Sequence, residues 1–499
     1  MSFKVLIANR GEIALRAIRA CKELGISTVS VYSEGDKDLK HLRFSDETVC
    51  IGPTSPLESY LNIPSILSAA ELTQVDAIYP GYGFLAEDPD FAEMCQKSGF
   101  KFIGPDAKTI RKMGDKITAK TLAEKAGIQT VPGYKDEIPE DPEKFKAVAR
   151  DVGYPIMIKA TAGGGGRGMR VVEKEEDLIT LAQITMQEAK NAFGNETIYL
   201  EKFIANPRHV EVQVVGDGKG KAIHLGTRDC SMQRRHQKII EEAPALNLNE
   251  VALEKIFSAC IKLCESINYE GAGTLEFLYE NDNFYFIEMN TRIQVEHPVT
   301  ELVTGVDLVR EQLRIAAGEP MSCGELMIRG HSIEVRLYAE DAANNFLPAI
   351  GKLAVFSPPE GPGVRLDTGV REGDEVTPNY DPMLAKLIVW APSRPEALQR
   401  MRRALDEFVV LGTTTNIRFL RELCDQSEVV NGTTDTTTID RLWPNGWSPN
   451  VSQSIQSAAL LVASCAEVNG LQRRTSSNSN QVISDGPVSP FHTLNRRFP

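Results

Sequence analysis

The first hundred residues alternate short apolar runs with longer amphipathic segments. Residues 3–8 form an apolar run typical of a buried strand, and residues 11–24 carry apolar side chains at helical spacing. Gly25 stands where a helix often ends, and residues 26–32 predict the next strand. Two further apolar runs continue this alternation, which is typical of a parallel sheet covered by helices. We therefore expect an α/β domain over residues 1–114.

Three further parts follow along the chain. Asp115 can cap a helix that begins a domain over residues 115–330, which is rich in strand and hairpin patterns. Residues 331–446 alternate short strands with Gly and Pro turns and finish in a helix over residues 394–408. Residues 447–499 form an extension that is expected to be partly disordered, because its end is rich in Ser, Asn and Pro.

The charge and the cysteines narrow the classes of partner and compartment. A formal net charge of −13 over 499 residues disfavours nucleic acid or an anionic membrane as a partner, because both attract basic faces. The nine cysteines are scattered without a CxxC pair, which favours a reduced compartment. The sequence enters a strand pattern at once, and no apolar stretch reaches the roughly 20 residues of a membrane-spanning helix. We expect a cytoplasmic protein that binds neither nucleic acid nor membrane.

A glycine-rich loop over residues 159–169 lies between two strand patterns. Its Gly163, Gly165 and Gly168 match the letters of a dinucleotide-binding fingerprint, but that motif requires a helix next, and a strand pattern follows here. A P-loop is excluded because no Gly-Lys pair is followed by Ser or Thr. The loop can close over phosphates through its backbone amides, with Lys159 as a cation at its base. The alternative is a plain mobile turn.

A hairpin is predicted where two strand patterns meet at Asp282. Pairing that is symmetric about this residue places Glu276 opposite Glu288, on one face with Leu278 and Phe286. Two carboxylates in apolar company require a positive charge between them. The alternative is that both glutamates point to solvent from an exposed face.

A divalent metal is the natural positive group for this carboxylate pair. Such an ion bridges carboxylates and nucleotide phosphates, and the amide oxygen of Asn290 is expected on the same face as a further ligand.

Charged residues continue directly after the hairpin. Arg292, Gln294 and Glu296 could fix a small anion and remove a proton from it, although such neighbours are usually only a surface ion pair. His297 stands before a proline and is expected to be structural. The basic run over residues 228–238 is either a solvated face or a site for phosphate or bicarbonate.

Several long strings are specific enough to identify a family. They are IANRGEIALR, YPGYGFLAE, MGDK, IKATAGGGGRGMR, RDCSMQRRHQK, GAGTLEF, FIEMNTRIQVEHPVTE and IEVRLYAED. Through these strings the chain resembles the biotin carboxylase family over residues 1–446, as the biotin carboxylase subunit of an acyl-CoA or pyruvate carboxylase. The resemblance implies a Rossmann-like N-terminal domain, an α+β ATP-grasp body with a mobile lid at about 131–203, and a C-terminal biotin carboxylase domain.

The resemblance also implies a role for each matching position. The implied ATP-binding residues are Lys116, Lys159, Gly164, Gly165, Gly166, Glu201, Lys202, His209, Gln233, His236, Glu276 and Glu288. The implied metal ligands are Glu276, Glu288 and Asn290. The implied bicarbonate and biotin site consists of Lys238, Arg292, Gln294, the backbone at Val295, Glu296, Arg336 and Tyr82. Within it, Glu296 is the expected base and Arg336 the group that stabilises the biotin enolate, with Lys238 and Arg292 as further catalytic residues.

The implied activity uses ATP, bicarbonate and Mg²⁺ or Mn²⁺, with two ions expected, to carboxylate biotin. Bicarbonate attacks the γ-phosphate, the resulting carboxyphosphate breaks down to CO₂ and phosphate, and phosphate takes the biotin N1 proton before CO₂ is captured. The sequence contains no Ala-Met-Lys-Met string, so the biotin is expected on a separate carrier protein or carrier-bearing subunit, and a further expected partner is the carboxyltransferase subunit. Another ATP-grasp ligase and a non-catalytic nucleotide-binding regulator are the alternatives.

Assembly and the final acceptor are less closely defined. Arg19, Glu23 and Arg365 match family dimer contacts and imply a homodimer, whereas Pro362 departs from the phenylalanine often found near this position. Tyr79 and Val335 are two further departures, and neither changes a reacting group. Acetyl-CoA, propionyl-CoA and pyruvate all remain open as acceptors. The apolar helix predicted after residue 454 resembles the C-terminal extension of archaeal-type pyruvate carboxylase A subunits, which slightly favours pyruvate.

Overall fold

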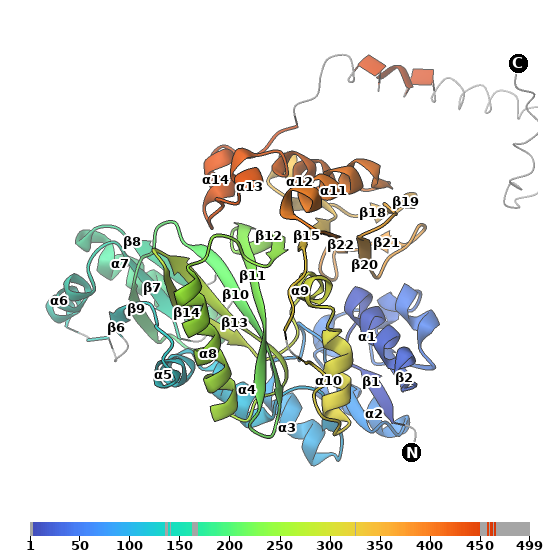
Figure 1. Cartoon of the computed structure of the whole chain (residues 1–499), viewed down its shortest axis with the longest axis horizontal. Helices are drawn as coiled ribbons and strands as arrows, with labels where there is room; N and C mark the ends of the chain where they lie inside the picture. Colours follow the sequence, from blue (N-terminus) through green and yellow to red (C-terminus); the bar gives the residue numbers. More distant parts are fainter. Residues whose placement is uncertain are drawn as a thin grey trace, which may run out of the picture. The chain divides into compact units, whose positions relative to one another are not determined.

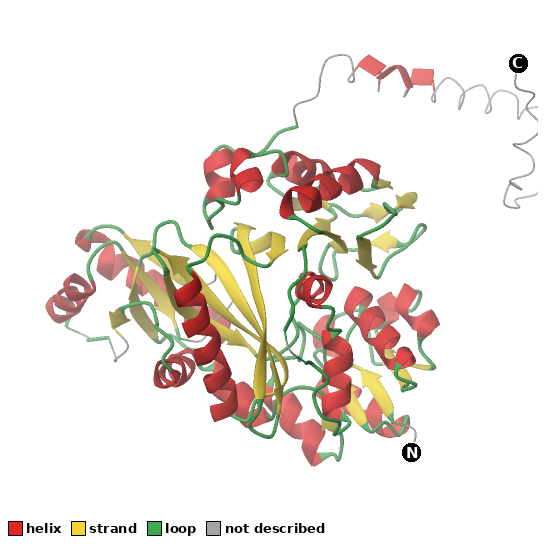
Figure 2. Cartoon of the chain, in the orientation of Figure 1, coloured by secondary structure: helices red, strands yellow, loops and turns green. Residues whose placement is uncertain are grey.

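A computed structural model describes residues 3–134, 138–139, 141–161, 168–324, 326–449, 457–458, 460–462 and 464–465. The chain divides into a compact unit over residues 1–447 and a second unit over residues 448–499. The described positions between 457 and 465 are helical, whereas the end of the extension lies outside the described residues. Figures 1 and 2 show helices packed around several sheets in the first unit.

The N-terminal part of the first unit contains a five-stranded parallel sheet in the order β3-β2-β1-β4-β5. Its strands are β1 (Lys4–Ile7), β2 (Ser27–Tyr32), β3 (Glu47–Cys50), β4 (Ala77–Tyr79) and β5 (Lys101–Phe102). The accompanying helices are α1 (Gly11–Glu23), α2 (Ile63–Leu72), α3 (Pro89–Lys97) and α4 (Ala107–Gly114). The predicted alternation is therefore confirmed, and Gly25 adopts a positive φ of 69° just past the end of α1.

An eight-stranded antiparallel sheet forms the centre of the unit, in the order β14-β13-β10-β11-β12-β15-β22-β20. Its strands are β10 (Arg208–Asp217), β11 (Ala222–Arg234), β12 (Gln237–Ala243), β13 (Glu270–Glu280), β14 (Asn283–Asn290), β15 (His331–Tyr338), β20 (Val364–Thr368) and β22 (Met383–Ala391). The helices beside it are α5 (Lys116–Ala126), α8 (Glu250–Ser266), α9 (His297–Thr304) and α10 (Leu308–Ala316). Because β12 pairs with β15, this sheet continues across residue 330.

A smaller antiparallel sheet lies beside α6 (Pro142–Val152) and α7 (Leu178–Phe193), in the order β6-β9-β7-β8 (Figure 1). Its strands are β6 (Gly133–Tyr134), β7 (Ile156–Ala160), β8 (Met169–Val172) and β9 (Ile198–Lys202). The pairing of β7 with β8 confirms that strands flank the glycine-rich loop. Gly164, Gly165 and Gly166 lie outside the described residues.

The last part of the unit is more helical than the sequence pattern indicates. Its remaining strands are β16 (Glu340–Asp341), β17 (Leu347–Pro348), β18 (Gly351–Lys352), β19 (Val355–Ser357), β21 (Glu375–Val376) and β23 (Val409–Leu411). The predicted helix is α11 (Arg394–Glu407), and α12 (Ile417–Leu423), α13 (Ser427–Asn431) and α14 (Thr438–Leu442) follow it. The expectation that this part finishes in one helix is thus wrong, because Phe419, Leu420 and Leu423 bury the short helix α12 in the same core.

The β13–β14 hairpin reaches the predicted pairing by an unexpected route. Its tight turn contains Asn281 and Asp282, both with positive φ, so a regular ladder would place Ile287 opposite Glu276. A register shift between Glu276 and the following pair instead places Glu288 opposite Glu276. The same bulge turns Phe286 to the face opposite Glu276, where it pairs with Phe277, so the predicted common face for Phe286 is wrong.

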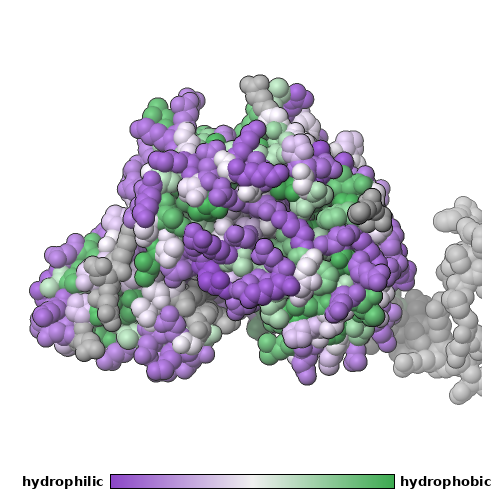
Figure 3. Space-filling model, turned by 90° about the horizontal axis from the view of Figure 1, so that it is seen from below, coloured by the Kyte–Doolittle hydropathy of each residue, from purple (hydrophilic) through white to green (hydrophobic). Residues whose placement is uncertain are grey.

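The surface of the unit is mostly polar. Figure 3 shows hydrophilic residues over much of one face, with apolar residues in smaller separate areas. Among the helices in the described part of the chain, none is both long enough and apolar enough to cross a membrane.

A buried ion cluster holds the last part of the unit to the central sheet. Glu242 on β12 lies 2.6 Å from His331 Nε2 and accepts a 2.6 Å hydrogen bond from Arg394 Nε. Burial alone would raise the pKa of Glu242, but these two partners outweigh it and lower the pKa to about 2. The ionised carboxylate therefore stabilises the fold above its ordinary pKa of 4.5, and this stabilisation is lost as pH falls from 4.5 towards 2.

Arg394→Met is expected to lower the free energy of unfolding at pH 7 by about 3 kcal/mol, because it leaves Glu242 buried with one partner fewer. Urea denaturation at pH 7 and pH 3 measures this loss, which should be smaller at pH 3. Arg403→Met is the control, since Arg403 makes an exposed pair with Glu407, and it should change stability by less than about 0.5 kcal/mol. Equal effects of the two substitutions would contradict this account of the cluster.

Candidate active site

Lys238 is the centre of a group of buried carboxylates on the central sheet. From β12 its Nζ donates to Glu296 Oε1 at 2.8 Å, to Glu276 Oε1 at 3.0 Å and to Glu211. Burial opposes the charged ammonium, but the three carboxylates outweigh it and hold the pKa of Lys238 well above its ordinary value. One cation thus shares three anions, and the surplus negative charge must be matched by neighbouring groups.

Glu276 on β13 is the most heavily coordinated of these carboxylates. Its Oε2 lies 2.9 Å from His209 Nε2, and its Oε1 accepts hydrogen bonds from Asn290 Nδ2 at 2.8 Å and Gln294 Nε2 at 2.6 Å. Although burial would raise the pKa of Glu276, Lys238 and His209 lower it strongly. The pKa of His209 rises to about 9 despite burial, because the Glu276 charge favours the imidazolium.

Glu288 and Asn290 complete the predicted metal-binding group. Burial raises the pKa of Glu288, and the facing charge of Glu276 raises it further, while Lys116 opposes both effects. Asn290 Oδ1 accepts a 2.7 Å hydrogen bond from Arg292 Nη2. The carboxylates of buried Glu276 and half-buried Glu288, with one amide oxygen, are ligands that suit Mg²⁺ or Mn²⁺, and such an ion would neutralise the facing pair.

Arg292 is held by a residue that sequence reasoning missed. Glu87, from the segment after β4, accepts from Arg292 Nε at 2.7 Å and from the backbone amide of Thr291 at 3.1 Å. The pKa of Arg292 is raised because the Glu87 charge outweighs burial. Glu87 lies within the string YPGYGFLAE, but its partner is 205 residues away, so no local pattern could reveal the contact.

Glu296 and Arg336 form the second half of the cluster. Arg336 on β15 donates from Nη2 to Glu296 Oε2 at 2.9 Å and from Nε to Glu241 Oε1 at 2.6 Å. Burial disfavours the charged form of Glu296, but Lys238 and Arg336 lower its pKa, so the carboxylate is ionised and can accept a proton. Glu241 differs, since burial raises its pKa to about 7.

The sequence left two alternatives for the basic run over residues 228–238, a solvated face or a site for phosphate or bicarbonate. Neither alternative describes the whole run. Arg228 is fully buried on β11, where it donates to Glu211 Oε2 at 2.9 Å and Gln294 Oε1 at 2.5 Å. Its other hydrogen-bond acceptors are Gln213, Thr274 and Thr300. Arg228 therefore fixes the walls of the cluster, while Lys238 at the other end of the run lies inside it. Sequence reasoning missed both Arg228 and Glu211 as site residues.

The predicted nucleotide-binding residues are only partly brought together. Lys159 Nζ lies 2.6 Å from Glu201 Oε2, and Lys120 also pairs with this buried glutamate. His236, in the β11–β12 turn, has its pKa lowered by burial and by the charges of Lys159 and His209.

Two further predicted nucleotide-binding residues lie on neighbouring strands. Gln233 is buried on β11, opposite Lys238 in the sheet. Lys202 lies on β9, and its ammonium donates to the carbonyl oxygens of Gly153 and Tyr154, at 2.7 and 3.1 Å. Because adjacent residues on a strand point to opposite faces, only the backbone of Lys202 remains available beside Glu201.

Tyr82 contacts Glu12 on α1. Its hydroxyl donates to Glu12, and burial together with this carboxylate raises the pKa of Tyr82 well above its ordinary value. Its predicted place at the biotin pocket stays a prediction.

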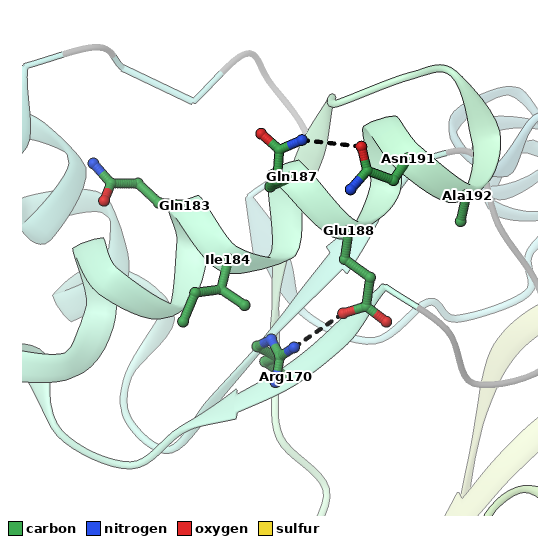
Figure 4. Close-up of a pocket in the computed structure, with 7 residues that line it drawn as sticks. All are labelled: Arg170, Gln183, Ile184, Gln187, Glu188, Asn191 and Ala192. Atoms are coloured by element: carbon green, nitrogen blue, oxygen red, sulfur yellow. Dashed lines mark hydrogen bonds and ion pairs between the residues drawn. The ribbon is translucent and has the colours of Figure 1, made fainter.

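An open hollow on the outer side of α7 contains none of the predicted site residues. Figure 4 shows Gln183, Gln187 and Asn191 spaced along the helix, with Glu188 directed towards Arg170 on β8. The Arg170–Glu188 pair measures 3.0 Å and is partly exposed, so this hollow adds no reacting group to the site.

Three family profiles match the chain in succession. Residues 1–110 match the N-terminal domain of biotin carboxylase, residues 115–323 the ATP-binding domain of the carbamoyl-phosphate synthase L chain, and residues 334–441 the C-terminal domain of biotin carboxylase. Together with the site, these matches define an ATP-grasp ligase.

Individual relatives cover most of the chain. A biotin carboxylase of Pseudomonas aeruginosa is 57% identical over 86% of this chain and 96% of its own length. A pyruvate carboxylase subunit from Methanothermobacter thermautotrophicus is 50% identical over 88% and 90%. The biotin carboxylase domain of the 2-oxoglutarate carboxylase of Hydrogenobacter thermophilus, solved with MgADP and bicarbonate, superimposes with a TM-score of 0.85 at 47% identity, over 89% and 98%. The chain belongs to the biotin carboxylase family.

The protein is expected to bind Mn²⁺ through Glu276 and Glu288, and either Glu276→Gln or Glu288→Gln should weaken that binding at least ~10-fold, because the ion loses a charged ligand. Titration followed by the electron paramagnetic resonance of free Mn²⁺ measures the affinity. Glu280→Gln, at the turn end of the same hairpin, is the matched control and should bind as the wild type does. Undiminished binding in both site variants would place the metal elsewhere.

Proposed function

We propose that this chain carboxylates biotin on a separate carrier protein, using ATP and bicarbonate, with Glu296 as the base. The arrangement of Glu296 between Lys238 and Arg336 is the main support, since an ionised carboxylate lies between two cations that can each hold an anion. The Hydrogenobacter relative, solved with MgADP and bicarbonate, supports the same ligands here.

Each half of the cluster has a separate task in this proposal. Lys238 and Arg292 hold bicarbonate with Gln294 and the Val295 backbone, while Glu296 removes its proton before it attacks the γ-phosphate. Attack forms carboxyphosphate and releases ADP, and carboxyphosphate then divides into CO₂ and phosphate. Phosphate accepts the N1 proton of biotin, Arg336 stabilises the negative charge on the ureido oxygen, and N1 bonds to CO₂.

Metal and nucleotide would lie on the other side of Glu276. Glu276, Glu288 and Asn290 would hold Mg²⁺ or Mn²⁺, two ions being expected, and bound metal neutralises charge on the transferring phosphoryl group. Lys116, Lys159, Glu201, His209, Gln233 and His236 are proposed to surround the nucleotide, together with Gly164, Gly165, Gly166 and the backbone of Lys202.

The partners in this proposal are a biotin carrier, a carboxyltransferase and a second copy of the chain, in the cytoplasm. The Methanothermobacter relative favours a place in a pyruvate carboxylase. In the isolated chain, Arg365 Nη1 already donates to Glu301 at 2.7 Å, and Arg310 to Glu23 at 3.1 Å. A dimer contact through Arg365 or Glu23 would therefore share or exchange these intrachain partners.

The domain boundaries are likewise proposed at residues 114, 330 and 446, with a lid at about 131–203. The central sheet crosses the second boundary through the β12–β15 pair, so the two domains on either side would share one sheet.

The two half-reactions test this function. Wild-type protein is expected to cleave ATP slowly with bicarbonate and faster when free biotin is added. Glu296→Ala should abolish bicarbonate-dependent ATP cleavage, while Arg336→Ala should lose biotin carboxylation by ~10²- to 10³-fold and lose ATP cleavage by less, because its charge is needed later. Phosphate release and ¹⁴C-labelled bicarbonate fixed on biotin give the two rates.

Arg235→Ala, on the exposed β11–β12 turn, is the control for these variants and should retain both rates. Equal losses of the two activities in Arg336→Ala would assign the arginine to ATP or bicarbonate binding. ATP cleavage by the wild type that ignores bicarbonate would refute the proposed function itself.

A further inference from the structure

Lys386 on β22 is a fully buried lysine that lies outside the group formed by Lys238, Glu211, Glu276 and Glu296. Its Nζ donates to the carbonyl oxygen of Val295 at 2.9 Å and lies 3.1 Å from Glu12 Oε1 and 3.8 Å from Asp367 Oδ2. These partners come from helix α1, from strand β20 and from the segment between β14 and α9. One ammonium group therefore joins three distant parts of the chain.

Charge balance accounts for part of this lysine, since the buried carboxylates of Glu12, Glu334 and Asp367 all favour its ammonium. Asp367 already accepts two hydrogen bonds from Arg365, at 2.8 and 3.0 Å, and Glu12 accepts one from Tyr82. Burying an ammonium group costs several kcal/mol, and buried ion pairs are often replaced by apolar residues without loss of stability. The contact with a definite effect on the site is the one with the Val295 carbonyl.

The Val295 carbonyl belongs to the peptide bond that leads directly into Glu296. Fixing this carbonyl fixes the peptide plane, and hence the direction in which the Glu296 side chain leaves the backbone. The preceding Gln294 donates to Glu276, and its carbonyl lies 2.8 Å from His297 Nδ1. His297 is thus structural, as expected, and Lys386 fixes the Val295–Glu296 peptide that lies between Gln294 and His297.

We propose that Lys386 is a positioning residue that holds the Val295–Glu296 peptide in place for bicarbonate. Glu12 on α1 orients the Lys386 ammonium and also accepts a hydrogen bond from the Tyr82 hydroxyl. The segment from Gln294 to Glu296 and the Tyr82 side chain are therefore both held through Glu12. Lys386 itself touches no reacting group in this scheme. The inference rests on the proposed function, because it assigns bicarbonate to the segment from Gln294 to Glu296.

The Lys386→Met variant tests the proposal, since it keeps an unbranched side chain of nearly the same length and removes the donor. The KM for bicarbonate in ATP cleavage should rise about 10- to 100-fold, the range for losing a hydrogen bond from a charged group. The KM for ATP and the kcat at saturating bicarbonate should change less than ~3-fold, because the nucleotide side does not contact this lysine. An equal rise of both KM values in the folded variant would overturn the proposal.

A double variant, Lys386→Met with Glu12→Gln, separates positioning from charge balance. It removes Glu12, one of the facing anions, together with the cation, so thermal stability should recover in part while the KM for bicarbonate stays raised. Recovery of both stability and KM would mean that Lys386 serves only the fold, and would overturn the proposal.

Arg394→Met supplies the matched control, because it breaks another buried ion pair of the same sheet without touching the Val295 segment. It should lower stability and leave the KM for bicarbonate unchanged, and a comparable rise in that KM would overturn the assignment to Lys386. Wild-type protein without bicarbonate-dependent ATP cleavage would instead refute the proposed function, whatever the variants show.

Discussion

The architecture of the site depends on burying several carboxylates around one ammonium group. Lys238 can reach Glu211, Glu276 and Glu296 together only because β13, β10, β11 and β12 lie side by side in one antiparallel sheet. Each carboxylate carries a desolvation penalty that Lys238 alone cannot offset, so Arg228, His209 and Arg336 surround the group. Glu288 lies opposite Glu276 in the hairpin, and a divalent cation would neutralise this carboxylate pair.

The central sheet continues beyond β12, so strands from the last part of the unit also contribute residues to the proposed active site. The β12–β15 pairing brings Arg336 to Glu296, and the β15–β22 pairing sets Lys386 opposite Arg336. The same run of strands thus supplies the group proposed to stabilise the biotin enolate and the lysine proposed to hold the Glu296 backbone. A sheet shared in this way is suited to keeping the base and the enolate-stabilising group in a fixed relation.

Local sequence patterns predicted those features of the fold that depend on residues close together in the sequence. Glu276 lies opposite Glu288 as expected, but only because of a bulge, whereas the parallel sheet and the Asp115 cap follow from periodicity and turn chemistry. The face of Phe286 did not, because a single bulge changes the register in a way that residue types do not reveal. The contacts of Glu87, Arg228 and Lys386 were also missed, since each joins segments far apart in the sequence. Motif resemblance located the site, but it did not show that the Lys202 ammonium is bound to backbone carbonyls.

The most direct test follows the oxygen of bicarbonate. If bicarbonate deprotonated by Glu296 attacks the γ-phosphate, the attacking oxygen stays on phosphorus when carboxyphosphate divides. Wild-type protein given ATP, biotin and freshly dissolved ¹⁸O-labelled bicarbonate should release phosphate that carries one labelled oxygen per turnover, as measured by mass spectrometry. Phosphate that carries oxygen from water alone would contradict the account.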